Sequence, residues 1–138
     1  MTEIQPDLTL FYNLETFVAE ITFDSNQNRG QGFIYQIQIT SDYEHQYFIG
    51  SITYIGTHSY INNIVCSGDF VTIRLPEGDI NCLLQRSKFS STLDYALVPG
   101  IYYLPITGGS KNFAFVKGTV ALVVLENKER IMYVYFTK

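Results

Sequence analysis

Apolar and polar residues alternate along most of this chain with the two-residue period of β-strands. The alternation is clearest in residues 32–39, where Gln36 and Gln38 lie on one face and apolar side chains on the other. The apolar face holds Phe33, Tyr35, Ile37 and Ile39. No segment keeps the 3.6-residue period of a helix over ten or more residues. The pattern therefore predicts an all-β protein.

Clusters of Gly, Pro, Asn, Asp and Ser separate the apolar segments and mark turns. The predicted strands cover residues 17–23, 32–39, 45–56, 70–75, 80–89, 92–98, 101–106, 119–125 and 130–137. Residues 1–7 are expected to form a loose tail, and residues 8–12 an edge strand or a lid. About eight strands at this spacing favour a sandwich or a barrel. We assign residues 1–138 to a single domain, which is long enough to bury its own core.

The amino-acid composition limits the kinds of molecule that the protein is expected to bind. Charged residues make up 16% of the chain, against an average of ~25%, and the chain has 11 Tyr, 10 Phe and no Trp. Such a composition predicts apolar surface hidden in a lumen, in an oligomer interface, or in both. A net charge of −4 and the lack of a basic run argue against binding to nucleic acid or to a membrane surface. With no signal-peptide pattern and no apolar stretch of transmembrane length, we expect a soluble cytoplasmic protein.

Several kinds of chemistry lack their usual residues. Cys66 and Cys82 are too few for a disulfide framework or a zinc site, and we expect both to be small apolar core residues, with a reactive thiol as the alternative. His45 and His58 lie in or near predicted turns, away from other metal-binding residues, so no metal is expected. The chain has no nucleophile elbow, phosphate-binding glycine loop or dinucleotide fingerprint, so we also expect no cofactor.

A glycine-rich segment near the end of the chain carries the most specific pattern. Residues 105–109 read Pro-Ile-Thr-Gly-Gly, and paired glycines can adopt the positive φ of a tight turn. Phe113 follows as an aromatic plug, and Gly118 opens the next apolar run. This pattern resembles the signature of allene oxide cyclases and dirigent proteins, and residues 132–136 look like the last strand of a dirigent barrel. The resemblance implies an eight-stranded antiparallel barrel, which can hold one small ligand. Both families form trimers, so it also implies a homo-oligomer, either a trimer or a dimer.

Glu20 is the strongest candidate for a catalytic group. It lies in the middle of an apolar predicted strand, where a desolvated carboxyl could act as a general acid or base. Residues 18–22 also resemble the allene oxide cyclase strand that carries a catalytic Glu, followed two residues later by an Asn. The resemblance implies a catalytic role for Glu20 and places Thr22 where the family has the Asn that positions a water. The alternative is that Glu20 lies on the solvent face of its strand.

Aromatic side chains that face inward would form the walls of a substrate site. The candidates are Phe33, Tyr35, Tyr47, Tyr54, Phe89 and Tyr95. The alternative for each is ordinary core packing or a subunit interface. Arg74 and Arg86, on neighbouring predicted strands, would bind a substrate carboxylate if they faced inward and would be solvated if they faced outward.

Three functions are compatible with these residues. The first is a cofactor-independent cyclase or isomerase that holds a small, apolar, unsaturated substrate in a reactive conformation. The second is a barrel that binds a small lipophilic molecule without chemistry, or guides a coupling reaction as dirigent proteins do. The third is a structural barrel with a filled interior. An inward, desolvated Glu20 would favour the enzyme, whereas an outward one would favour the other two.

Overall fold

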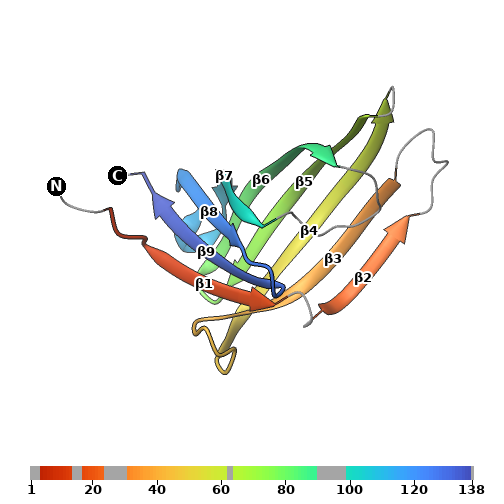
Figure 1. Cartoon of the computed structure of the whole chain (residues 1–138). Coiled ribbons are helices and arrows are strands. Elements are labelled where there is room, and N and C mark those ends of the chain that lie inside the picture. The colour runs from red at the N-terminus through yellow and green to blue at the C-terminus, as the bar shows by residue number, and fades with distance from the viewer. Residues whose placement is uncertain (1–3, 14–16, 24–30, 62–63, 90–98, 138) are drawn as a thin grey trace.

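The computed structural model describes residues 4–13, 17–23, 31–61, 64–89 and 99–137, with the side chains of all of these except 17–23, 31–33, 57–61, 64–68 and 85–89. The elements are β1 (Leu8–Asn13), β2 (Phe17–Phe23), β3 (Gln31–Thr40), β4 (Phe48–Ile61), β5 (Ile64–Leu75), β6 (Gly78–Phe89), β7 (Gly100–Gly109), η2 (Lys111–Phe113), β8 (Gly118–Val124) and β9 (Glu129–Phe136). All the strands belong to one sheet, in which every neighbouring pair is antiparallel (Figure 1).

The sheet closes into a barrel because β1 pairs with strands on both of its sides. It pairs along its whole length with β9, from Leu8↔Val134 onwards, and it meets β3 at Phe11↔Thr40. The ring therefore consists of the eight strands β1 and β3–β9, while β2 continues along the edge of β3 in the same direction as β1. This confirms the predicted eight-stranded antiparallel barrel.

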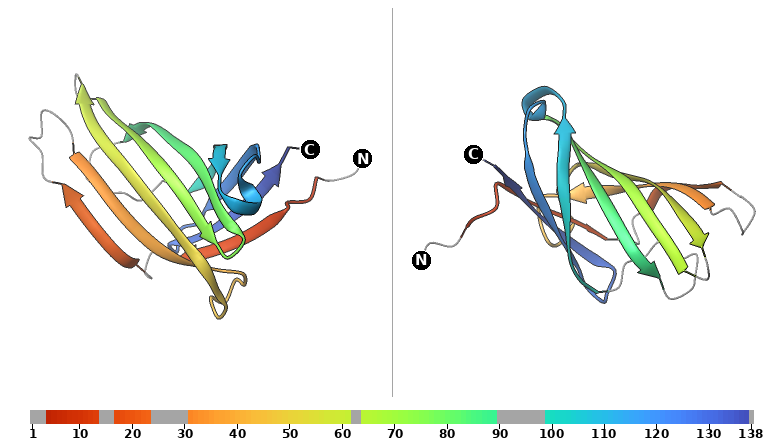
Figure 2. Two further views of the ribbon diagram at one scale, coloured as in Figure 1. Left: turned by 180° about the vertical axis from the view of Figure 1, so that it is seen from behind. Right: turned by 90° about the horizontal axis from the view of Figure 1, so that it is seen from above.

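The barrel is wider on one side than a regular cylinder would be. Strands β4, β5 and β6 have 14, 12 and 12 residues, but β6 pairs with β7 only at Ile80, Asn81 and Cys82. Beyond these three pairs, the group β2–β6 diverges from the group β7–β9, as Figure 2 shows from above. The ends of β2, β4 and β6 and the starts of β3 and β5 project from this wide side.

The described part of the core occupies the barrel interior and is built mainly from alternate residues of β1 and β3–β9. Tyr35, Ile37 and Ile39 of β3 are buried, which confirms the apolar face predicted for that segment. Apolar residues on the other strands complete the core. They include Leu10, Ile52, Ile73, Ile80, Leu104, Leu122 and Val134. Burial of these side chains supplies the main driving force for folding.

The paired glycines do not form the predicted turn. Strand β7 runs on through Gly108 and Gly109, and the reversal follows it, through η2, where Lys111 has a φ of 52°. Gly109 is required instead by close packing, because a Cβ there would collide with the Asp79 carbonyl oxygen. Phe113 does act as a plug, since it is buried and its ring stacks on Phe136 at 5.7 Å.

Four other expectations need correction or lie outside the described residues. Asp7 is not part of a loose tail, because its N–H donates to Val134 O and its carboxylate accepts from Phe136 N, each at 2.7 Å. Residues 8–12 form a barrel strand rather than a lid, since β9 supplies a full partner. Strand β4 begins at Phe48, not at His45. The strand predicted for residues 92–98 lies outside the described residues.

Within the described residues, none of the helical structure is long and apolar enough to cross a lipid bilayer.

Candidate functional site

Three tyrosines from three strands meet inside the barrel. Tyr35 on β3 and Tyr54 on β4 are register partners, and their rings stack with centroids 4.6 Å apart. The hydroxyl of Tyr12 on β1 lies 2.5 Å from the hydroxyl of Tyr54. All three side chains are buried. Closure of the barrel between β1 and β3 brings Tyr12 to this cluster, although it lies far from Tyr54 in the sequence.

Asp69 places a carboxyl group on the same interior surface. Asp69 lies on the same face of β5 as the core residues Val71 and Ile73, because the three are spaced two residues apart. It is only 3% exposed. Its register partner is Gly56, two residues along β4 from Tyr54, which is roughly 7 Å along the strand. Burial of a carboxyl group is costly unless other groups compensate, so carboxyl groups in such settings often serve a function.

Arg130 adds a buried cation near the other side of the cluster. It is the register partner of Tyr12, and its Nη1 donates to the carbonyl oxygens of Leu125 at 3.2 Å and Glu129 at 2.9 Å. The two carbonyl contacts hold the guanidinium at the start of β9. The interior surface thus carries a carboxyl group, a tyrosine stack and a guanidinium.

This arrangement suits a flat, unsaturated molecule. Tyrosine rings offer planar apolar faces that also attract positive charge, and tyrosine hydroxyls can donate to a carbonyl oxygen. A carboxylate in a desolvated setting can accept a proton or stabilise a developing positive charge. These side chains therefore have the chemistry for contacting such a molecule and for exchanging a proton with it.

Among the candidate residues whose side chains the structure describes, two lie together in the interior. Tyr35 and Tyr54 face the interior as expected and stack on each other. Glu20 is the backbone register partner of Tyr35, and Thr22 that of Phe33. The side chains of Glu20, Thr22, Phe33 and Phe89 are outside the described part of the chain, as is the whole of Tyr95. Their proposed roles stay predictions.

Tyr47 does not face the interior, which corrects its assignment to the substrate site. Its side chain is 65% exposed and lies in the loop before β4. The loop bends because the Asp42 carboxylate accepts hydrogen bonds from the N–H groups of Gln46 and Tyr47, and His45 adopts a φ of 60°. These contacts interrupt the strand alternation on which the assignment depended.

The two arginines considered as carboxylate ligands do not form a described interior pair. Arg74 faces outward, with its side chain 64% exposed and its Nε 3.6 Å from Asp79 Oδ1. The side chain of Arg86 is not described.

Sequence reasoning missed Asp69, Tyr12 and Arg130. Asp69 follows Ser67 and Gly68, and the three residues together read as a turn. Its two-residue spacing from Val71 and Ile73 was the signal that could have identified it as an interior residue. Only the barrel closure reveals that Tyr12 belongs to the site.

The described interior offers no reactive thiol and no metal site. Cys82 is buried as expected, and burial raises the pKa of its thiol to about 12. Among the described residues, no group of three or more His, Cys, Asp and Glu side chains could hold a metal ion.

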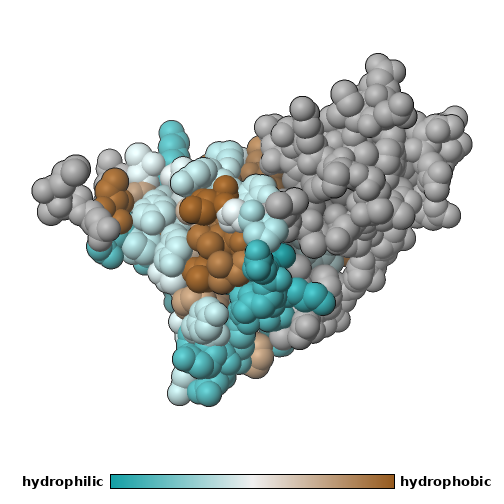
Figure 3. Space-filling view, in the orientation of Figure 1, coloured by the Kyte–Doolittle hydropathy of each residue, from teal (hydrophilic) through white to brown (hydrophobic). Residues whose placement is uncertain are grey.

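A second, apolar surface lies outside the barrel. A groove of about 660 Å³ runs over the outer faces of β7, β8 and β9, with Tyr103, Ala121 and Tyr135 among its lining residues. None of its lining residues carries a formal charge. Figure 3 shows apolar side chains gathered on the face over β9.

Comparison with known proteins supports the fold and gives no family. No protein-family model matches the chain, and no curated protein sequence matches it significantly. Among solved structures, the chain is similar to a pyocyanin demethylase, with a TM-score of 0.64 at 16% sequence identity. The alignment covers 94% of this chain and 98% of the demethylase chain. The match shows a shared barrel architecture, and the resemblance to allene oxide cyclases and dirigent proteins stays a prediction.

Proposed function

We propose that this barrel is an enzyme that isomerises or cyclises a small, flat, unsaturated molecule by proton transfer inside the barrel. The observation that carries the proposal is Asp69, a carboxyl group that is almost fully buried beside a stack of tyrosines. The similarity to pyocyanin demethylase supports it only in that the same fold can carry an enzyme that acts on a small molecule.

The proposed reaction uses binding and one proton exchange. The substrate packs against the Tyr35–Tyr54 stack, and the paired hydroxyls of Tyr12 and Tyr54 orient its carbonyl or epoxide oxygen. Asp69 then removes a proton from one carbon and returns it to another, so that no electrons are gained or lost. Holding the reactive conformation removes much of the entropic barrier, and a positioned carboxylate typically adds a factor of about 10²–10⁴.

Glu20 remains a second proposed proton carrier. Its backbone is paired with that of Tyr35, which places it on the strand next to the tyrosine stack. Thr22 stands in the same strand and, in this proposal, holds a water molecule for Glu20. Separate variants of Asp69 and Glu20 will show which of the two carboxyl groups transfers the proton.

A non-catalytic binding barrel is the alternative, and one observation favours it. The hydroxyls of Tyr12 and Tyr54 already bond to each other, and the rings of Tyr35 and Tyr54 already stack. The cluster could therefore present a fixed shape to a lipophilic ligand without taking part in a reaction.

Asp69→Asn tests the proposal, with Asp79→Asn as a matched control on the outer surface. A panel of unsaturated carbonyl compounds and epoxides, with pyocyanin included, is incubated with each protein in D₂O. Chromatography with mass spectrometry then detects isomers and incorporated deuterium. Binding is followed by tyrosine fluorescence, which is informative because the chain has no Trp.

We expect the wild type and Asp79→Asn to form an isomer of one compound, with deuterium in it to the extent that the Asp69 proton exchanges with solvent, and Asp69→Asn to form it at least about 100-fold more slowly while still binding. Equal turnover by Asp69→Asn would overturn the role of Asp69. Binding of a compound by all the proteins, with no conversion by any, would instead favour the binding barrel.

A further inference from the structure

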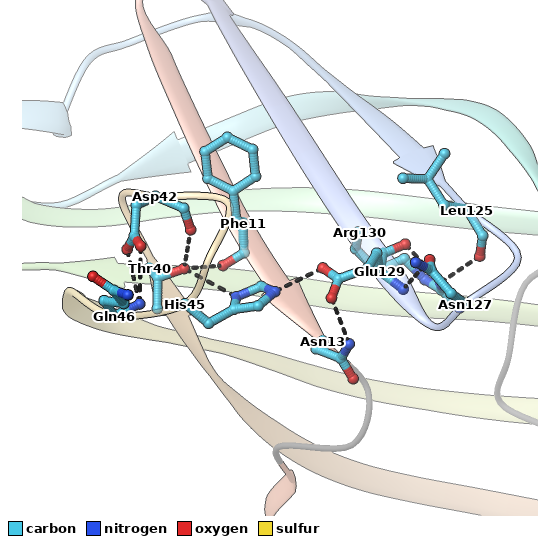
Figure 4. A network of polar contacts seen from close by, with 10 residues as sticks. All are labelled: Phe11, Asn13, Thr40, Asp42, His45, Gln46, Leu125, Asn127, Glu129 and Arg130. Carbon is cyan, nitrogen blue, oxygen red and sulfur yellow. Dashed lines mark hydrogen bonds and ion pairs between the residues drawn. The ribbon is translucent and has the colours of Figure 1, made fainter.

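The seam at which the barrel closes is short, and a polar network crosses it. Strands β1 and β3 share the single register pair Phe11↔Thr40. Side chains from β1, β3, the loop after β3 and the start of β9 meet at this point (Figure 4). Thr40 is only 1% exposed, so its hydroxyl must be satisfied within the protein.

The network links Thr40, His45, Glu129 and Asn13 in a chain. Thr40 Oγ1 lies 3.1 Å from His45 Nδ1, and His45 Nε2 lies 2.6 Å from Glu129 Oε2. The other carboxylate oxygen of Glu129 accepts from Asn13 Nδ2 at 2.7 Å. Glu129 therefore connects the loop that carries His45 to the last residue of β1.

Counting the hydrogens shows which bonds the network can make with and without a proton on both nitrogens of His45. Thr40 Oγ1 also lies 2.8 Å from the carbonyl oxygen of Asp42 and 3.4 Å from that of Phe11. The single hydroxyl hydrogen can go to one of these carbonyl oxygens, and His45 Nδ1 then donates to Oγ1. The hydroxyl can instead donate to an unprotonated Nδ1, and both carbonyl contacts are then lost. Nε2 must donate in either case, since the Glu129 carboxylate only accepts. Only an imidazolium ring can donate from both nitrogens and so leave the Thr40 hydrogen for a carbonyl oxygen.

We propose that His45 and Glu129 form a proton-dependent latch that holds the seam between β1 and β3 closed. With the proton bound, His45 bridges Thr40 and Glu129. Without it, a neutral ring donates to Glu129 and accepts the Thr40 hydrogen, so Thr40 loses its bond to a carbonyl oxygen and the His45–Glu129 contact is no longer an ion pair. The latch is therefore fully engaged at mildly acidic pH and loosens as the pH rises. Histidine is the side chain suited to this range.

Some charged groups near the His45 imidazole stabilise its protonated form, and one destabilises it. The Asp42 carboxylate, in the same loop, favours the imidazolium. Desolvation acts to raise the pKa of Asp42, but backbone hydrogen bonds, among them those from Gln46 and Tyr47, and a smaller contribution from His45 together lower it overall. On β9, the Glu129 carboxylate also favours the imidazolium, whereas the Arg130 guanidinium opposes it.

The latch also positions part of the interior site, an extension that rests on the proposed function. Asn13, which Glu129 holds, directly follows Tyr12, whose hydroxyl contacts Tyr54. A Glu129 carboxylate that is no longer ion-paired with His45 would hold Asn13 less firmly, and the looser end of β1 would disturb the hydroxyl pair that orients the substrate. His45 and Glu129 are thus positioning residues for Tyr12.

Hydrogen exchange in the ligand-free protein tests the latch without any substrate. Protection factors, which are corrected for the intrinsic effect of pH, are measured for the amides of β1 and, as an internal reference, for those of β4 and β5. In the wild type we expect β1 protection to fall about ten-fold or more from mildly acidic to mildly alkaline pH, while the reference amides stay constant. His45→Gln should remove this pH dependence, and His58→Gln should keep it.

Equal pH dependence in the wild type and His45→Gln would overturn the latch. Should His45→Gln fail to fold, ring ¹⁵N shifts of the wild type decide the question. Protonation of both nitrogens of His45 at mildly acidic pH supports the proposal, and a neutral ring contradicts it. None of these results depends on Asp69, so failure of the latch and failure of the proposed enzyme can be told apart.

Discussion

Burial determines what the thiol of Cys82 can do. Desolvation disfavours the thiolate, which is the reactive form, and raises the pKa from its ordinary 9.0 to about 12. The folded chain therefore keeps the proton on this thiol at any pH at which the protein is ordinarily handled.

We expect Cys82 to resist thiol reagents in the native protein and to react on unfolding. In the Cys66→Ser variant, Cys82 is the one remaining thiol. Its reaction with a thiol reagent is followed at mildly alkaline pH with and without denaturant. Because the folded pKa lies above the unfolded one, Cys82 should also make the free energy of unfolding fall as the pH rises from about 9 to about 12. Fast labelling of the native variant would contradict the burial.

At the scale of single residues, alternation predicted the aromatic interior better than the polar groups within it. Tyr35 and Tyr54 could be placed because apolar neighbours repeat at two-residue intervals around them. Asp69 could not, since Ser-Gly-Asp is more typical of turns than of strand interiors. Tyr47 was misplaced because a carboxylate, Asp42, bends the chain before it.

At the scale of elements, backbone contacts between neighbouring strands determine where glycine is required. Gly118 begins β8 with a φ of 151°, and a Cβ at this position would collide with the Tyr135 carbonyl oxygen on β9. Gly108 has a similar φ, but a Cβ added there would meet no atom of a neighbouring strand within 4 Å. The two positions therefore separate the effect of crowding from that of backbone conformation.

We expect Gly118→Ala to lower the free energy of unfolding by about 1–3 kcal/mol or more, because the β8–β9 ladder must shift to make room. Urea denaturation of both glycine variants measures the effect. Gly108→Ala should lower the free energy of unfolding clearly less than Gly118→Ala does. An equal decrease in the two variants would show that crowding by the neighbouring strand is not the cause.

The strands themselves were largely predictable, and their irregular ends were not. The segments 70–75 and 80–89 correspond to β5 and β6, but β5 starts earlier, at Ile64. Polar and glycine residues near that start hide a strand that is paired on both sides by β4 and β6. Pairing with neighbours thus overrode the local turn preference.

At the scale of the whole molecule, the uncharged groove over β7–β9 is the first surface to test for the expected dimer or trimer. Tyr103 lines it and is 71% exposed in the single chain. We expect sedimentation velocity to show self-association that Tyr103→Lys weakens, because a charge there would have to be desolvated in the contact. Gln38→Lys adds the same charge at an exposed position on β3 and should have no effect. A monomer at all concentrations would contradict the expected oligomer.

Closure of the barrel was beyond prediction from periodicity alone. The resemblance in residues 104–138 suggested a barrel, but nothing local in β1 indicates that it pairs with β9. Such pairing depends on how the whole sheet curves, and this curvature cannot be predicted from any short segment of the sequence.

The pairing of Leu8 with Val134 also affects how the protein is made. On the ribosome, the hairpins of β3–β6 can form as soon as they emerge, since each joins neighbours in the sequence. The ring itself must wait for β9, so the emerging chain exposes its apolar interior for most of its synthesis. Contacts of such long range also slow folding. Newly made chains should therefore depend on chaperones until the last strand arrives.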